Sequence, residues 1–389
     1  MKVSQRLSRI SPSLTLAVTG KAKAMKKEGI DVISFAAGEP DFDTPAFIRA
    51  AACRAIEEGK TRYTPAKGMP ELVEAVREKF LRENGLEYSA SQIVISCGAK
   101  HSLYNAFTAV LDPGDEVIIP SPYWVTYPEQ VGLAGGVPVF LDSREDQGYR
   151  LDFEALQAAL SPRTRAIVVA SPCNPSGGIY PVEDLEKIAD LAVSRGLIVV
   201  SDEIYEHLVF DGFRSVSIAS LSPKIKDHTI VVNGVSKAYA MTGWRIGYLA
   251  APEPVAKAIS SFQSHSTSNP ATMTQYAALA ALKGDQGCVE EMRLAFEGRR
   301  DAIMDRFSRI EGITCVRPTG TFYTFPNISA FGLGSLELAD RLLEEARIAV
   351  VPGIAFGWDT NIRMSFADSL ENIMRGIDRF EEFLSRLRV

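Results

Sequence analysis

Short apolar runs alternate with amphipathic stretches through the middle of the chain, and this alternation limits the possible fold more than any other feature. Seven runs are predicted to be strands, at 92–96, 116–119, 137–141, 166–170, 197–201, 229–233 and 246–250. They are apolar at nearly every position, which is typical of parallel strands buried on both faces. Helical periodicity occupies the stretches between them. The sequence therefore predicts an α/β protein whose large domain has a seven-stranded, mostly parallel sheet sandwiched by helices.

The last third of the chain has a different pattern. A long charged helix is predicted at 290–310, short strands at 314–317 and 322–325, and further helices at 335–346 and 369–387. This mixture predicts a smaller α+β domain built from both termini. We expect residues 1–44 to form an N-terminal arm and part of the small domain, 45–285 the large domain, and 286–389 the rest of the small domain. A cleft between two domains is a usual place for a small-molecule site.

Charge and cysteine content exclude several classes of protein. The chain has 42 lysines and arginines against 48 aspartates and glutamates, a net charge of −6, which argues against nucleic-acid binding. No apolar run reaches the roughly 18 residues of a membrane span, and the first residues lack the apolar core of a signal peptide. The acid-free start also suits a transit peptide, but 11–28 equally suits the start of a helix. We expect a cytoplasmic protein.

Metal-binding patterns are missing from the sequence. The five cysteines are scattered without a CxxC pair, and the four histidines show no HExxH spacing. Neither a disulfide framework nor a metal site is expected.

Polar residues follow the predicted strands, where the carboxyl ends of parallel strands bind ligands. Gly98 and Ala99 lie at a helix start, whose free N–H groups can hold a phosphate. The other residues placed beyond strand ends are Asn174, Asp202, Tyr205, Ser236, Lys237 and Arg245. This set of residues suits pyridoxal 5′-phosphate. That cofactor needs an amine for an imine link, an acid beside its ring nitrogen, hydrogen-bond donors to its phenolic oxygen and a cation at its phosphate.

Several motifs, in order along the chain, carry a resemblance to a known family. Ser236-Lys237 with Thr242-Gly243-Trp244-Arg245-Ile246-Gly247 resembles the lysine signature of class I (fold type I) pyridoxal-phosphate-dependent aminotransferases. Asn174-Pro175-Ser176-Gly177 and Asp202-Glu203-Ile204-Tyr205 are similar to the other two cofactor motifs of that family. The resemblance extends from Gly38-Glu39-Pro40-Asp41-Phe42 to Asn361-Ile362-Arg363-Met364-Ser365. It is closest to bacterial-type aspartate aminotransferases.

The resemblance implies a role for each residue around the cofactor. Lys237 forms the imine and then moves a proton between the substrate α-carbon and the cofactor. Asp202 keeps the pyridine nitrogen protonated, because a buried carboxylate favours a neighbouring N–H⁺. Asn174 and Tyr205 would donate hydrogen bonds to the phenolic oxygen, and Trp124 would stack on the ring. The phosphate would be held by Arg245, Gly98 and Ala99, and by Tyr63 of a second subunit.

One position departs from the family pattern. Many members have a serine three residues before the lysine as a phosphate ligand, and this chain has Gly234 there. Ser236, directly before Lys237, is the candidate for the missing hydroxyl contact.

Substrate recognition is implied at two ends. Arg363 matches the arginine that binds the α-carboxylate through a bidentate fork, and the Gly38 backbone, Asn174 and Trp124 lie at the same end. Lys100 matches a lysine that binds the side-chain carboxylate in some bacterial-type members. Thr15 is expected to close over the substrate. A fixed cation at the far end favours acidic substrates over alkyl or aromatic ones.

The resulting hypothesis is a homodimeric aminotransferase for dicarboxylic amino acids. It would convert L-aspartate and 2-oxoglutarate to oxaloacetate and L-glutamate by a ping-pong mechanism. The alternatives within the fold are a prephenate (arogenate-forming) aminotransferase and a pyridoxal-phosphate aspartate decarboxylase or lyase. A DNA-binding sensor would need a basic helix-turn-helix segment, and a nicotinamide dehydrogenase would need a GxGxxG motif after the first strand. The sequence offers neither.

Overall fold

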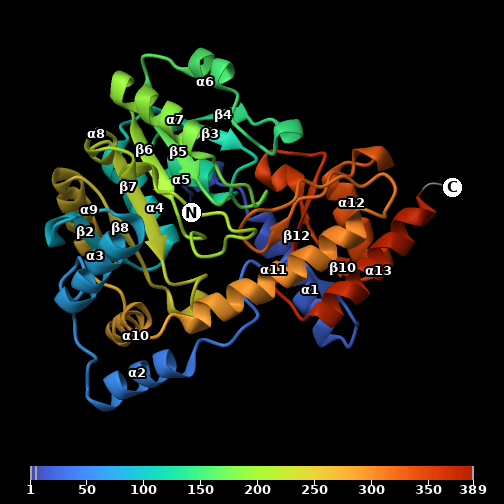
Figure 1. Cartoon of the computed structure of the whole chain (residues 1–389), viewed down its shortest axis with the longest axis horizontal. Coiled ribbons are helices and arrows are strands. Elements are labelled where there is room, and N and C mark those ends of the chain that lie inside the picture. Colours follow the sequence, from blue (N-terminus) through green and yellow to red (C-terminus); the bar gives the residue numbers. More distant parts are fainter. Residues whose placement is uncertain (1, 5–6, 388–389) are drawn as a thin grey trace.

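A seven-stranded sheet forms the centre of the computed structural model, which describes residues 2–4 and 7–387 (Figure 1). The spatial order is β2-β8-β7-β6-β5-β3-β4, and β8 alone among them runs antiparallel to its neighbours. The strands are β2 (Ile93–Ser96), β3 (Glu116–Ser121), β4 (Val137–Asp142), β5 (Thr164–Ala170), β6 (Ile198–Asp202), β7 (Thr229–Gly234) and β8 (Gly247–Ala250). The predicted seven-stranded, mostly parallel sheet is confirmed, with every strand end within two residues of its predicted position.

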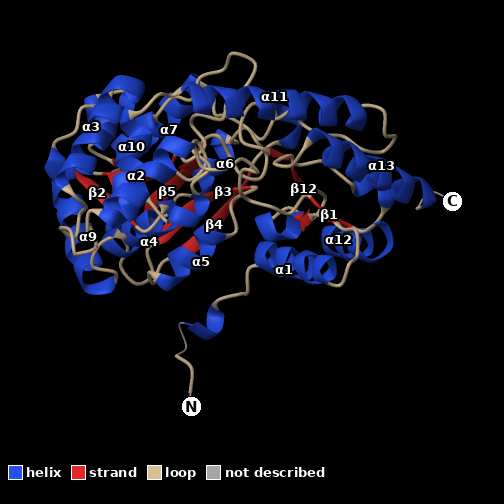
Figure 2. Ribbon diagram, turned by 90° about the horizontal axis from the view of Figure 1, so that it is seen from below, coloured by secondary structure: helices blue, strands red, loops and turns tan. Residues whose placement is uncertain are grey.

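Side chains that alternate along a strand pack into two separate hydrophobic clusters, because successive residues of a strand point to opposite faces of the sheet. In β5, Ala166 and Val168 pack in one cluster, and Ile167 and Val169 pack in another. The first cluster includes α4 (Ala99–Val110), α5 (Thr126–Leu133) and α9 (Glu253–Ser266), and the second includes α6 (Phe153–Ala159), α7 (Val182–Arg195) and α8 (Pro223–Lys226). Helices therefore cover both faces of the sheet (Figure 2).

The β2 end of the sheet has its own helical cover. A further cluster packs Ile93 and Ile95 of β2 against α2 (Ala46–Glu57), α3 (Pro70–Asn84) and α10 (Thr272–Lys283). Val94, between them, belongs to the cluster on the opposite face. This alternation accounts for the unbroken apolar run of Ile93, Val94 and Ile95, since neither face meets solvent.

Burial on both faces is a wrong prediction for β4. Val137 and Phe140 are 46% and 49% exposed. Among the described residues, β4 pairs only with β3 and forms the edge of the sheet. Leu141 is the one residue of β4 that is buried, in the cluster that includes α6 and α7.

The smaller part of the molecule joins the two ends of the chain. β1 (Ile33–Ser34) pairs in parallel with β10 (Ile348–Ala349). An antiparallel sheet of three short strands lies beside them, in the order β11 (Val351–Pro352), β12 (Ile362–Ser365) and β9 (Tyr323–Thr324). Its helices are α1 (Leu14–Lys27), α11 (Gly287–Phe307), α12 (Ser335–Arg341), which continues as a π-helical turn at Leu342–Ala346, and α13 (Leu370–Arg386).

The strand predicted at 314–317 is not formed. Within that range Thr314 alone makes an isolated bridge, with Asn327. The β-branched residues of this segment therefore follow an irregular path, because no neighbouring strand offers a longer run of pairing. The division of the chain at 44/45 and 285/286 stays a prediction.

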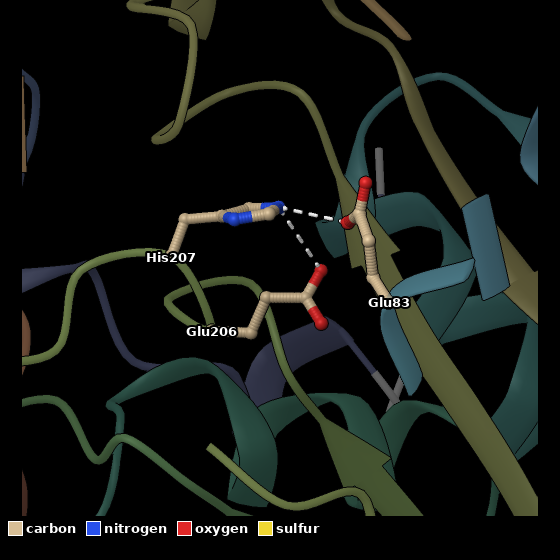
Figure 3. Close-up of side chains that lie close together, drawn as sticks. All are labelled: Glu83, Glu206 and His207. Atoms are coloured by element: carbon tan, nitrogen blue, oxygen red, sulfur yellow. Dashed lines mark ion pairs between the residues drawn. The ribbon is translucent and has the colours of Figure 1, made fainter. Parts of the chain in front are cut away.

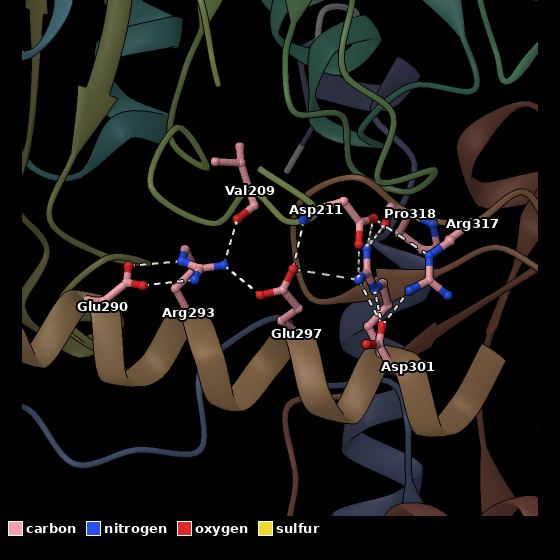
Figure 4. Close-up of polar contacts among 9 residues, drawn as sticks. Val209, Asp211, Glu290, Arg293, Glu297, Asp301, Arg317 and Pro318 are labelled. Atoms are coloured by element: carbon pink, nitrogen blue, oxygen red, sulfur yellow. Dashed lines mark hydrogen bonds and ion pairs between the residues drawn. The ribbon is translucent and has the colours of Figure 1, made fainter. Parts of the chain in front are cut away.

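Helix α11 runs from the side of the large sheet to α13 (Figure 1) and fixes two loops on its way (Figure 4). The Arg300 guanidinium, with a fully buried side chain, donates to the Asp211 carboxylate at 2.5 and 2.8 Å and to the Pro318 carbonyl at 3.0 Å. The Asp211 backbone N–H donates to Glu297 at 2.7 Å. One helix thus holds two loops that are more than 100 residues apart in the sequence.

A partly buried group of charges joins α3 to the segment after β6. The Nε2 of His207 lies 3.4 Å from Glu83 and 3.5 Å from Glu206 (Figure 3). Lys79, 1% exposed, pairs with both carboxylates. Burial opposes the ionisation of Glu206, but Lys79, His207 and an Asn84 amide donor hold its pKa below the ordinary value. The positive charge that a metal ion would bring to these carboxylates is already supplied by Lys79.

Replacement of Lys79 by methionine should lower the free energy of unfolding by about 3–5 kcal/mol, because it leaves the buried Glu206 carboxylate without its cation. Chemical denaturation at neutral pH measures the change. The double variant Lys79→Met/Glu206→Gln should recover most of the loss, since the pair is then removed together and Asn233 can still donate to residue 206. Equal instability of the single and double variants would contradict this account.

Candidate active site

A cavity of about 610 Å³ opens at the carboxyl edge of the large sheet, between the sheet and α1. It gathers residues that are far apart in the sequence. The lining residues predicted for the cofactor are Ala99, Trp124, Asn174, Asp202, Tyr205, Ser236, Lys237 and Arg245. The lining residues predicted for the substrate also include Thr15, Gly38, Lys100 and Arg363. Gly98 lies directly behind Arg245, at the start of α4.

Lys237 lies in the turn after β7, half-buried, with its amine in the cavity. Its Nζ donates a hydrogen bond to the Gly38 carbonyl at 2.5 Å. Desolvation lowers the pKa of Lys237 to about 8, and the charges of Arg363 and Arg245 act in the same direction. An amine with this pKa is largely neutral under mildly basic conditions and is therefore a nucleophile.

Asp202 is the last residue of β6 and is buried at the floor of the cavity. The Tyr127 hydroxyl donates to its Oδ2 at 2.7 Å, and the Ile204 backbone N–H donates to Oδ1 at 3.3 Å. Desolvation nevertheless raises the pKa of this carboxyl. A cationic N–H group placed beside it would relieve that cost, because opposite charges stabilise each other most strongly where water is excluded.

The first turn of α4 and Arg245 form a cradle for an anion. Among the described residues no side chain caps α4, whose N-terminal residue Ala99 lines the cavity. A Cβ at Gly247 would lie 2.2 Å from the Ala99 nitrogen, so only glycine lets β8 approach α4 this closely. The Arg245 guanidinium packs on Gly98 and donates to the Thr242 carbonyl at 2.7 Å. Helix N–H groups and a guanidinium are both suited to phosphate.

The structure gives a physical reason for Gly234. This residue pairs with Gly247 across β7 and β8. A Cβ at Gly234 would lie 3.0 Å from the Gly247 Cα and 3.2 Å from the Ile204 Cδ1. A serine there would crowd the same contact that brings β8 to α4. Ser236, in the next turn, is buried and lines the cavity.

Arg363 projects from β12 into the opposite wall and is 2% exposed. It donates to Asn174 Oδ1 at 3.0 Å and to the Ala36 carbonyl at 3.1 Å. Its Nε has no partner among the described residues. Burial lowers the pKa of this guanidinium, so the charge is held at a cost. A carboxylate would supply both the missing acceptor and the missing negative charge.

Lys100 and Thr15 both line the cavity, Lys100 from the first turn of α4 and Thr15 from the start of α1. The Lys100 Nζ lies 4.9 Å from the Trp124 ring centroid. Desolvation and the charge of Arg245 lower the pKa of Lys100. Thr15 is held at the start of α1 by a 2.8 Å hydrogen bond between its hydroxyl and that of Ser13.

Tyr63 is not brought into the cavity of its own chain. Its side chain is 90% exposed and lies outside the lining residues. Its predicted contact with a phosphate therefore depends on a second copy of the chain.

Two tyrosines of the site were missed by the sequence reasoning. Tyr127, the donor to Asp202, follows Trp124 by three residues, and an aromatic residue so close to the predicted ring-stacking position was an available signal. Tyr323 lies in β9, and its hydroxyl is 3.0 Å from that of Tyr205. No local pattern distinguishes Tyr323 from its aromatic neighbours Phe322 and Phe325.

Comparisons with known proteins place this site in a family. The model of aminotransferase class I and II matches residues 30–380, and the chain belongs to that family. Within it, the chain is similar to aspartate aminotransferase of Geobacillus stearothermophilus, at 48% identity over 99% of both chains. A probable aspartate/prephenate aminotransferase of Aquifex aeolicus is 49% identical, again over 99% of both. The solved structure of aspartate aminotransferase from Thermus thermophilus with maleate matches with a TM-score of 0.95, at 45% identity, over 98% of this chain and 99% of that one. The predicted resemblance is confirmed.

The low pKa of Lys237 should be visible in the cofactor-free protein. Competitive acetylation followed by mass spectrometry should give a labelling midpoint near pH 8 for this amine, against roughly 10.4 for ordinary lysines. Arg363→Met removes a neighbouring positive charge and should move the midpoint upward. A midpoint above 10 in the unmodified chain would show that the amine is not desolvated.

Proposed function

We propose that this aminotransferase acts on dicarboxylic amino acids with pyridoxal 5′-phosphate. The first choice of substrates is L-aspartate with 2-oxoglutarate, converted to oxaloacetate and L-glutamate in two half-reactions. The observation that carries the proposal is a cavity that holds a low-pKa lysine, the Arg245 of the phosphate cradle, and two basic side chains available to substrate carboxylates, Arg363 and Lys100. Two cations suit a substrate with two carboxylates.

The residues of the cavity fit the cofactor. The uncapped start of α4 with Arg245 suits the phosphate, and the buried Asp202 carboxylate suits a protonated ring nitrogen. When bound, pyridoxal phosphate supplies a ring that withdraws electrons from the substrate α-carbon. The residues that would hold it are Lys237, Asp202, Tyr205, Asn174, Trp124, Arg245, Gly98, Ala99 and Ser236.

Three side chains of the cavity would have separate roles in the reaction. Arg363 binds the α-carboxylate through its fork and so fixes the orientation of the α-carbon. The Lys237 Nζ would take the proton from that carbon and deliver it to the cofactor, a role that suits an amine of lowered pKa. Asp202 holds the proton on the ring nitrogen.

Lys100 is the proposed ligand of the side-chain carboxylate, with Thr15 closing over the substrate. The same lysine suits the carboxylate of prephenate, and relatives of similar identity are named aspartate/prephenate aminotransferase. Prephenate is therefore the second candidate amino acceptor. An aspartate decarboxylase is the other alternative that the test below distinguishes.

We also propose a homodimer, in which the exposed Tyr63 of each copy contacts the phosphate of the other. The cytoplasm stays the expected location. All five cysteines are free, as is usual in a reducing compartment.

Addition of pyridoxal phosphate should give a yellow protein, and L-aspartate without an oxo acid should bleach it as oxaloacetate appears. Absorbance spectra with product analysis check both events. Release of alanine would instead indicate β-decarboxylation, and bleaching reversed by prephenate would establish the second acceptor. Lys237→Ala should show neither the yellow band nor turnover. Turnover by this variant would contradict the assignment of the lysine.

Lys100→Ala should reduce kcat/KM for aspartate and glutamate by roughly 10- to 100-fold, the worth of one hydrogen bond to a charged group. Alanine and phenylalanine should be affected far less, since they have no second carboxylate. Lys21→Ala is the matched control, because Lys21 lies on α1 outside the cavity and pairs with Asp340. An equal loss for all four substrates would show that Lys100 does not select them.

A further inference from the structure

Tyr323 connects the two halves of the site, although no role has been assigned to it. It is 1% exposed in β9. Its hydroxyl lies 3.0 Å from the hydroxyl of Tyr205, the proposed donor to the phenolic oxygen of the cofactor. Its ring centroid lies 4.2 Å from the guanidinium carbon of Arg363, the proposed ligand of the α-carboxylate. One side chain therefore contacts both groups.

The direction of the hydrogen bond between the two tyrosines follows from counting hydrogens. Each phenol has one hydrogen to donate. If Tyr205 donates its hydrogen to the cofactor, then Tyr323 must donate to Tyr205. A hydroxyl that accepts a hydrogen bond becomes a stronger donor in turn. Tyr323 thus directs the Tyr205 hydrogen towards the ligand and strengthens the bond that it makes.

We propose that Tyr323 is a positioning residue with two functions. Its hydroxyl orients and strengthens Tyr205 as a donor, and its ring face supports the buried charge of Arg363 through a cation–π contact. This inference rests on the proposed function.

The fold holds Tyr323 against Tyr205 through their flanking segments. The Phe210 N–H donates to the Thr319 carbonyl at 2.9 Å, and the Thr321 N–H donates to the Leu208 carbonyl at 2.8 Å. Arg300 of α11 fixes both segments from behind, through Asp211 and Pro318 (Figure 4). The two hydroxyls are thus placed by paired backbone and a buried arginine.

The backbone just before Tyr323 is under strain. Thr321, which is buried, has a φ of 66°, a left-handed conformation that is unusual for a β-branched residue. Its hydroxyl accepts a hydrogen bond from the Tyr323 N–H at 3.2 Å. Such conformations persist where the surroundings impose them and are concentrated at functional sites.

Tyr323→Phe tests the hydroxyl alone, because phenylalanine keeps the ring beneath Arg363. The pH midpoint of the visible absorbance of the holoenzyme should rise by roughly half a unit. The sign follows from the donor: a weaker bond from Tyr205 stabilises the unprotonated form of the chromophore less. The charged groups around the pair, Arg363, Lys237, Asp202 and Glu39, are unchanged in this variant.

A double-mutant cycle separates positioning from general disturbance. Tyr205→Phe should itself raise the midpoint, and adding Tyr323→Phe should give no further shift. Tyr149→Phe, which removes a buried hydroxyl outside the cavity, should give none. An unshifted Tyr323→Phe enzyme, or an equal shift in the Tyr205→Phe background, would overturn the hydroxyl function. A wild-type protein that never becomes yellow would instead refute the proposed function.

The proposed support of Arg363 by the Tyr323 ring is tested by ligand affinity. Tyr323→Leu should weaken maleate binding to the holoenzyme several-fold, because Arg363 loses its support, and Tyr323→Phe should leave maleate binding within about twofold. Equal affinities in the leucine and phenylalanine variants would overturn the role of the ring. If the leucine variant does not fold, Tyr323→Met tests the same point with a flexible side chain of similar length.

Discussion

Parallel alignment of β3, β5, β6 and β7 is the constraint on which the site depends. It brings the carboxyl ends of four strands to one edge, so that side chains from distant segments meet without a long loop. Asp202 and Lys237 follow neighbouring strands and lie on the same cavity for this reason. The antiparallel β8 brings the opposite end of a strand, its first residue, to this edge of the sheet. Its first residue, Gly247, lies against α4 and brings Arg245 beside the start of that helix.

The electrostatics of the cavity follow from gathering cations in a poorly hydrated space. Arg363 and Arg245 both disfavour a proton on Lys237, and desolvation adds to their effect. The same charges attract carboxylates and phosphate. One arrangement therefore gives both an amine of lowered pKa and affinity for anions. Burial raises the pKa of Asp202, and a cation bound beside its carboxylate would offset that effect.

Most of the sheet could be predicted because an apolar run of strand length is a local signal, and Val168 and Val200 are buried as this signal predicts. The exposure of Phe140 could not, because it depends on β4 being at the edge. The residues after the strands were found from the direction of a parallel sheet and from family motifs. Tyr323 was missed because its partner Tyr205 is 118 residues away, and the contact is made by folding rather than by spacing.

The cavity has two walls of different chemistry, which has a consequence for redesign. On the sheet side, Gly234 contacts Gly247, and Gly247 contacts the Ala99 nitrogen, so a side chain at either glycine would displace main chain. On the α1 side, the wall consists of side chains, and Leu16 is 72% exposed. Libraries intended to change the accepted substrate can therefore vary exposed positions of α1 that line the cavity, such as Leu16, without the displacement of main chain that a side chain at Gly234 or Gly247 would cause.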